Sequence, residues 1–313
     1  MIQHDLQTQA DTAAHVADTA AHVADTAAQA PGHVDLGEIL MHHTADAYAL
    51  DFQPLFHLSW EKWPDIHLAG LTLNLTPSKH VIYMAFAALL VFLTMWIAGR
   101  RLEKQRAGEN APKGFANAVE ALVLWVRNDV AVANIGENGA KFAPYIMALF
   151  FFILYCNLMG LMPWGATPTG NYAVTGGLAL LSLLTIEISG MVQLGFKGYM
   201  RTIFPHVPGV GGAGAMVISV AMAPIEILGK LVKPFALCVR LFGNMTAGHF
   251  VILALFGMIF LFGHIETWRW AIGAGSAVLV LGIMLLEIIV AFVQAYVFAL
   301  ITAVLIGVMQ HEH

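Results

Sequence analysis

The sequence predicts an all-α membrane protein with about five membrane helices plus one interfacial amphipathic helix, the last two membrane helices being long and strongly tilted. Of its 313 residues, 58% are hydrophobic and only 11% are charged, which is roughly half the charged fraction of an ordinary soluble domain. Several apolar runs reach the length of about 20 residues that spans the hydrocarbon of a bilayer. The last two apolar segments are much longer than one ordinary crossing, and this excess predicts their tilt.

The residues before the first apolar run divide into two parts. The unit Ala-Asp-Thr-Ala-Ala-His-Val occurs at 10–16 and 17–23, with a decayed third copy at 24–30. The period of seven could form a short alanine-rich helix, but we expect residues 1–32 to be a low-complexity, poorly ordered tail. Residues 33–78 are polar and aromatic, with Trp60 and Trp63, and we expect them to lie on the outer surface of the membrane. The membrane domain then comprises residues 79–313.

Three apolar segments have the length of a single membrane span. These segments are 79–98, 143–163 and 173–195. Between the first two, residues 115–132 place Glu120, Arg127 and Asp129 among Val and Leu residues. That mixture is typical of an amphipathic helix that lies in the membrane interface and does not cross the bilayer.

The last two apolar segments, 214–262 and 267–310, would run roughly 70 and 65 Å as helices, whereas the hydrocarbon is about 30 Å thick. Each could be a hairpin of two spans or one tilted helix. A hairpin in the first would need a turn near 230–234, which leaves a first arm of only about 16 residues. Neither segment has a cluster of turn residues in its middle, so we expect two single helices.

The distribution of Lys and Arg predicts the orientation. Residues 196–212 contain Lys197 and Arg201, whereas the segments on the opposite side hold only Lys62, Lys79 at the span edge, and Arg269. Seven of the 15 basic residues lie in 100–142, namely Arg100, Arg101, Lys104, Arg106, Lys113, Arg127 and Lys141. Positive charge accumulates on the cytoplasmic side of membrane proteins, so the N-terminus is expected outside and the C-terminus in the cytoplasm.

Arg240 lies well inside an apolar segment, where a guanidinium stays charged and costs at least about 3 kcal/mol to insert. It begins the run Arg-Leu-Phe-Gly-Asn-Met-Thr-Ala-Gly at 240–248. Eight of these nine positions match Arg-Leu-Phe-Gly-Asn-Met-x-Ala-Gly, so the run resembles the signature of the a subunit of F-type ATP synthases. That family is the stator half of a membrane proton motor. The resemblance also implies the two long, tilted helices.

Helical spacing places the polar residues of the two long segments on a few faces. Glu226 and Arg240 are 14 residues apart and lie within about 40° of each other on a straight helix. Asn244 is one turn beyond Arg240 on nearly the same face. On the last helix, Glu287 and Gln294 share a face.

His249 and Glu287 are expected to meet. With the two helices antiparallel and Arg240 level with Gln294, His249 and Glu287 fall within about 3 Å of the same height. A histidine can hold a proton near neutral pH, and a glutamate can stabilise its charged form, so the pair suits a proton access site. The alternative is a buried, hydrogen-bonded histidine beside an unrelated interfacial glutamate.

The resemblance shows two departures from the family pattern. Several relatives carry an acid where this chain has His249 and a histidine where it has Glu287, so the pair looks exchanged. Asn157 resembles a polar position of the family in the second span. Gly160 stands where some relatives place an acid, which puts in doubt an access-channel role at that site.

The resemblance implies that Arg240 faces a ring of hairpin subunits, each with one membrane carboxylate, between two offset half-channels. Protons would arrive past His249 and Glu287 and leave near Glu226. Arg240 could instead form a structural ion pair with an acid of its own bundle. Glu226 could equally pair with Lys230 one turn away. Lys230 and Lys233 are expected to reach the cytoplasmic interface.

The implied partners are the c-subunit rotor ring, the b-subunit peripheral stalk and the rest of the complex, in a bacterial plasma (inner) membrane. The chain lacks a Gly-x4-Gly-Lys-[Ser/Thr] nucleotide site, so we expect a non-catalytic subunit without a cofactor. It also lacks a basic tract for nucleic acid. Cys156 and Cys238 fit packing positions, and no ligand spacing predicts a metal.

Two rival functions come from other classes. A stand-alone secondary transporter could use Arg240 to bind an anionic substrate, but such folds usually show internal repeats, which we do not see in the membrane domain. An intramembrane metalloenzyme would need ligands at a spacing such as His-Glu-x-x-His, and the sequence has no such run.

Overall fold

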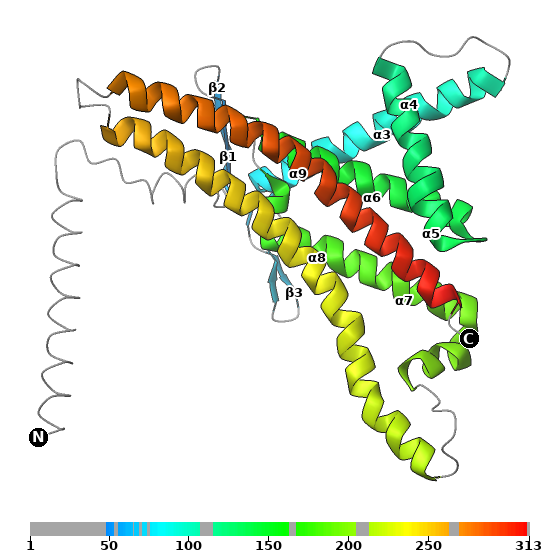
Figure 1. Ribbon diagram of the computed structural model, residues 1–313. Coiled ribbons are helices and arrows are strands. Elements are labelled where there is room, and N and C mark those ends of the chain that lie inside the picture. Colours follow the sequence, from blue (N-terminus) through cyan, green and yellow to red (C-terminus); the bar gives the residue numbers. More distant parts are fainter. Residues whose placement is uncertain are drawn as a thin grey trace, which may run out of the picture. The chain divides into compact units, whose positions relative to one another are not determined.

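The computed structural model describes residues 48–52, 56–64, 66–68, 71–73, 76–106, 115–162, 167–204, 213–262 and 269–311. The tail predicted at 1–32 lies outside these residues. The chain is an all-α membrane protein, as predicted, and its described residues include five helices long and apolar enough to cross a bilayer (Figure 1). They are α3 (Lys79–Arg106), α6 (Gly139–Gly160), α7 (Tyr172–Ile203), α8 (Ala213–Phe262) and α9 (Arg269–His311).

The first and third of these helices extend beyond the predicted spans. The first continues from 98 to Arg106, because the charged residue types that end an apolar span are themselves good helix formers. The Arg100 guanidinium lies 4.0 Å from the centre of the Trp96 ring. The third continues to Ile203 through a kink at Gly195, whose φ of 69° is a conformation that favours glycine.

The segment predicted as one amphipathic helix is helical but contains three elements. These are α4 (Phe115–Trp125), the π-helix η1 (Val126–Val132) and α5 (Ala133–Ile135). Val126, Val130 and Ala131 are buried, and α6 packs against η1. The apolar side of the segment is therefore covered by protein where it passes α6.

The two longest helices are each continuous, which confirms the choice of single helices over hairpins. α8 has 50 residues and α9 has 43, which correspond to about 75 and 65 Å. The chain forms two compact units that share these helices. Phe250–Val280 belongs to one, and Thr44–His249 with Leu281–His313 form the other.

Short strands occupy part of the segment before α3, and the sequence analysis did not predict them. β1 (Ala49–Phe52) pairs antiparallel with β2 (Phe56–Ser59), and β3 (Ile66–Leu68) pairs antiparallel with β4 (Leu71–Leu73). Trp60 Nε1 donates a hydrogen bond to the Pro77 carbonyl at 2.8 Å. The Trp63 amide donates to Thr76 Oγ1, also at 2.8 Å, so these two residues are tied to the start of α3.

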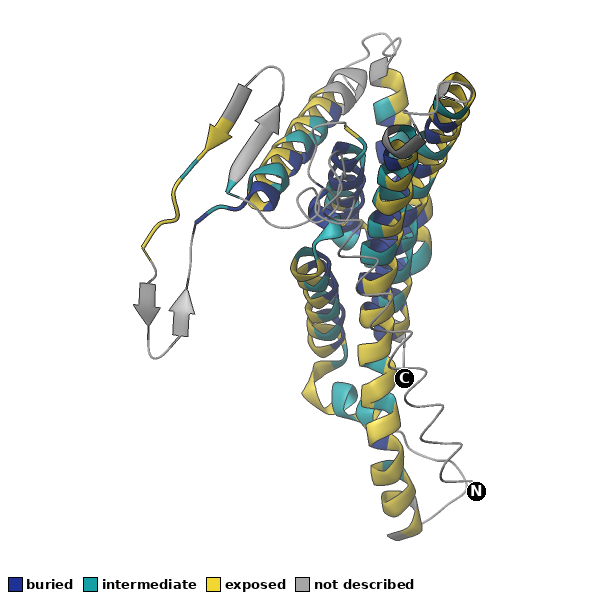
Figure 2. Cartoon of the chain, turned by 90° about the vertical axis from the view of Figure 1, so that its left-hand side faces the viewer, coloured by how far each residue is buried: buried dark blue, intermediate teal, exposed yellow. Residues whose placement is uncertain are grey.

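The core lies around α6, which has the largest buried share of the five long helices (Figure 2). Phe150 and Phe151 are buried and meet edge to face, with ring centres 5.2 Å apart. Phe298 of α9 and Leu241 of α8 are also buried in this core. α6 thus fixes the parts of α8 and α9 that carry the predicted polar residues.

Candidate functional site

Asn157 anchors a polar cluster near the end of α6, inside the larger unit. Its side chain is fully buried. Nδ2 donates to the Ala291 carbonyl of α9 at 3.3 Å, and Oδ1 accepts from Thr169 Oγ1 at 2.7 Å. Thr169 belongs to the 3-10 helix η2 (Pro168–Gly170). Asn157 therefore joins α6, α9 and the connection that precedes α7.

Glu287 and Gln294 lie on the same buried face of α9 as Ala291. Ala291 is four residues after Glu287 and three before Gln294, so the three share one side of the helix. Glu287 is 6% exposed and Gln294 is 8% exposed. Asn157 reaches this face between the two polar side chains, as the contact to Ala291 shows.

The Glu287 carboxylate lies directly against Gly248 of α8. A Cβ atom on Gly248 would overlap the carboxylate, so this close approach requires glycine. The contact puts Glu287 beside the residue that precedes His249, but His249 and Glu287 do not form a hydrogen bond with each other. Both carboxylate oxygens are buried, and neither has a hydrogen-bond partner among the described residues. A buried polar group without a protein partner costs free energy unless another group or water binds it.

His249 is half-buried and uses both ring nitrogens. Nδ1 lies 3.1 Å from the Met245 carbonyl, one helical turn earlier. Nε2 lies 2.9 Å from the Thr167 hydroxyl, in the connection between α6 and α7. The Thr167 side chain fills the space that a side chain at Gly160 would take. The Thr167 hydroxyl therefore occupies the space beside Gly160, the position at which we expected some relatives to carry an acidic side chain.

Thr167 and Thr169 were missed by the sequence analysis. Both flank Pro168 in a connection that contains no Lys or Arg. Two hydroxyl residues beside a proline, directly before a helix, were the only pattern that could have pointed to them. Helical periodicity gives no information about such a connection.

Arg240 has an exposed side chain in the middle of the apolar helix α8. No side chain in the described parts of the chain forms a hydrogen bond or ion pair with it. Asn244, one turn further along α8, is exposed as well. The internal ion pair considered for Arg240 is absent from the described residues.

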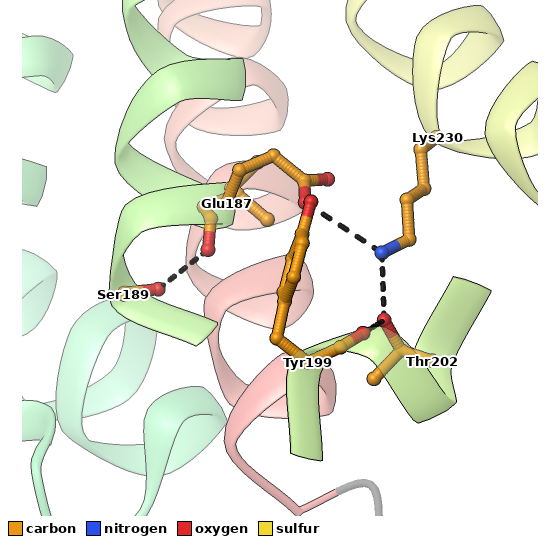
Figure 3. Close-up of polar contacts among 6 residues, drawn as sticks. Glu187, Ser189, Tyr199, Thr202 and Lys230 are labelled. Carbon is orange, nitrogen blue, oxygen red and sulfur yellow. Dashed lines mark hydrogen bonds and ion pairs between the residues drawn. The ribbon is translucent and has the colours of Figure 1, made fainter. Parts of the chain in front are cut away.

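Glu226 and Lys230 do not pair with each other. Lys230 Nζ instead lies 3.6 Å from Glu187 Oε2 and donates to Thr202 Oγ1 at 2.9 Å (Figure 3). Lys230 is therefore held by partners on α7, and its reach to the cytoplasmic interface stays a prediction. Glu226 is half-buried and has no partner among the described residues.

The angle predicted between Glu226 and Arg240 assumed a straight helix. α8 contains Pro224 and Pro234, and it bends along its length (Figure 1). A proline removes one helical hydrogen bond and allows such a bend. Pro234 lies between Glu226 and Arg240, so helical spacing alone does not fix their relative direction.

We expect Tyr199→Phe to lower the melting temperature of the purified protein by about 2 °C, the shift expected for about 1 kcal/mol in a large chain. Tyr199 follows the Gly195 kink, and its hydroxyl donates to Glu187 Oε2 at 2.5 Å, before the kink. The ring also lies under Lys230. The control is Tyr172→Phe, since Tyr172 is exposed and its packing against Phe242 needs only the ring. Equal melting temperatures for the two variants would contradict this role.

The five apolar helices and the buried polar cluster define a multi-pass membrane protein. Residues 81–307 match the family model described as ATP synthase A chain. The chain is 41% identical to ATP synthase subunit a of Anaeromyxobacter dehalogenans over 88% of its own length and 71% of the relative. It is 42% identical to that of Chloroherpeton thalassium, over 87% and 77%. For Myxococcus xanthus the identity is 43%, over 77% and 76%.

These similarities show that the chain belongs to the ATP synthase subunit a family, the proton-channel subunit of the membrane sector. It is therefore a component of the ATP synthase complex.

Proposed function

We propose that this chain is the non-catalytic stator subunit that couples proton flow to rotation, with Arg240 facing the carboxylates of the c-subunit rotor ring. The observation that carries the proposal is the exposed, unpaired guanidinium within an apolar helix. A charge there needs a partner, and the described residues supply none. A ring of acidic groups on another protein would provide it.

The surface around Arg240 suits the close approach of another helix. Ala236 lies one turn before Arg240 and Ala247 two turns after it, both exposed on the same side of α8. Small residues let helix backbones approach within a membrane, where close packing drives association. Asn244 adds a polar side chain on this surface. A rotor helix could therefore bring its carboxylate close to the guanidinium.

The access half-channel would run from the outer side to the ring past His249, Glu287, Asn157 and Gln294. Support comes from the polar cluster that joins α6, α8 and α9, and from the unpartnered carboxylate oxygens of Glu287. Buried polar groups of this kind bind water readily. In this orientation the N-terminus lies outside and the C-terminus in the cytoplasm.

The exit half-channel would open to the cytoplasm near Glu226. Lys230 is already neutralised by Glu187, so Glu226 is not needed to balance its charge. A half-buried acid without a described partner can take up and release a proton. Between the two halves, the fixed charge of Arg240 would repel a proton and block a direct leak. Each charge that crosses 100 mV supplies about 2.3 kcal/mol to rotation.

Purification of the tagged chain from its native membrane tests this proposal. We expect the rotor ring and the b-subunit peripheral stalk to co-purify, and the chain alone in liposomes to transport no small anion. A chain that purifies without a ring and carries out transport by itself would support the secondary transporter instead.

A further inference from the structure

The two hydrogen bonds of His249 define which nitrogen exchanges a proton. Nδ1 faces the Met245 carbonyl, which can only accept a hydrogen bond. Nδ1 must therefore carry a hydrogen and donate it. In the neutral ring Nε2 then has the lone pair, and the Thr167 hydroxyl donates to it. Nε2 is the atom that gains and loses the exchangeable proton.

Thr167 can hold this imidazole in both protonation states. When Nε2 gains a proton, its N–H becomes a donor and the Thr167 oxygen becomes the acceptor, with the same two atoms in contact. A hydroxyl allows this reversal because it both donates and accepts. A carboxylate can only accept, and an ammonium group can only donate.

The position of the Thr167 hydroxyl is itself fixed by packing. Its side chain occupies the space above Gly160, where even one added methyl group would collide with it. Two residues later, the Thr169 hydroxyl is bonded to the fully buried Asn157. The connection is thus attached to α6 on both sides of Pro168, and Oγ1 of Thr167 is held toward α8.

We propose that Thr167 is a positioning and relay residue for His249, a role that presupposes the proton access site proposed above. A hydronium ion gives a proton to Oγ1 while the original hydroxyl proton moves to Nε2. Two O–H bonds break, one in the hydronium ion and one in Thr167, and a new O–H bond on Thr167 and an N–H bond on His249 form. The hydronium ion is left as water, and Thr167 ends neutral. Its hydroxyl takes the place of the acidic side chain that Gly160 lacks.

The test measures proton-driven ATP synthesis by the whole complex in vesicles. Thr167→Val keeps the shape over Gly160 but removes the hydroxyl, and we expect synthesis to fall about tenfold, as for the loss of one functional hydrogen bond. Thr167→Ser keeps the hydroxyl, and we expect a rate within about twofold of the parent. The matched control is Thr185→Val on α7, since that hydroxyl bonds only within its own helix, to the Leu181 carbonyl.

A purely packing role and a relay role for Thr167 predict opposite orders of activity for Thr167→Val and Thr167→Ser. If Thr167 only fills space, Thr167→Val keeps its activity and Thr167→Ser loses it, and the relay role is wrong. The amount of chain in the purified complex shows whether each variant assembles. Should Thr167→Val not assemble, Thr167→Ala is measured in its place, with the same tenfold loss expected. Full activity of that variant, or a loss in Thr167→Ser equal to it, would also overturn the proposal.

The experiment distinguishes an incorrect relay role for Thr167 from an incorrect proposed function for the whole chain. If Arg240→Ala abolishes synthesis while Thr167→Val does not, only the relay is wrong. If Arg240→Ala synthesises ATP normally, the proposed function fails, whatever Thr167 does.

Discussion

Replacing Arg240 with alanine is expected to abolish proton-driven ATP synthesis. Arg240 is an exposed cation of α8 that has no partner among the described residues. Without it, a deprotonated rotor carboxylate would face an apolar surface, at a cost of about 3 kcal/mol. That cost corresponds to a loss of about two orders of magnitude. The measurement is ATP synthesis by the complex in vesicles with an imposed proton gradient.

A second measurement separates loss of gating from loss of assembly. In the Arg240→Ala variant, passive proton flow through the membrane sector should persist or rise, because the fixed charge that blocks a leak is gone. The matched control is Lys233→Ala, which removes an exposed cation about 10 Å away on the same helix. We expect this control to synthesise ATP at close to the parent rate. Continued synthesis by Arg240→Ala would disprove the gating role.

Exchange of His249 and Glu287 is expected to restore activity that each single change destroys. The single variants His249→Glu and Glu287→His leave two acids or two histidines at one level of the membrane. Each should lower ATP synthesis at least about tenfold, since one acid or base has lost its partner. The double variant restores one acid and one base, because Glu287 packs on Gly248, directly before His249.

The four rates of this exchange form a double-mutant cycle, which measures the coupling between the two positions. We expect the double variant to be several-fold more active than either single variant. If the fold-loss of activity in the double variant equals the product of the fold-losses in the two single variants, the two residues act independently. The Thr167 hydroxyl stays in place in all four proteins and can donate to an acid or an imidazole at position 249.

Helical features were the most predictable part of this fold. The length of each apolar run predicts the number of long helices, and the lack of turn residues in 214–262 and 267–310 predicts that each is one helix. The two β-hairpins before α3 were missed because three- and four-residue strands are too short to show a period. The kink at Gly195 was missed as an element boundary, since the helix resumes directly after it.

The candidate site was partly predictable for the same reason. The register of His249 and Glu287 follows from the rise and rotation of straight helices, and the structure shows Glu287 against Gly248. The direction of Glu226 does not follow, because Pro234 interrupts the pattern between it and Arg240. Contacts made by connections and by neighbouring helices depend on tertiary packing, which the sequence pattern does not show. For this reason the contact of Thr167 with His249 and the contact of Glu187 with Lys230 were not predicted.

The unpaired guanidinium of Arg240 also bears on biogenesis. If the proposed rotor ring is the partner of Arg240, a newly made copy of this chain carries a charge that its described residues do not neutralise until the ring binds, and local water or thinning of the bilayer must shield it. Orphan copies should therefore be short-lived targets of membrane proteases. Under this proposal, fewer chains would be degraded if the chain were synthesised after the acidic ring has assembled. The Arg240 charge would then be neutralised soon after the chain is inserted into the membrane.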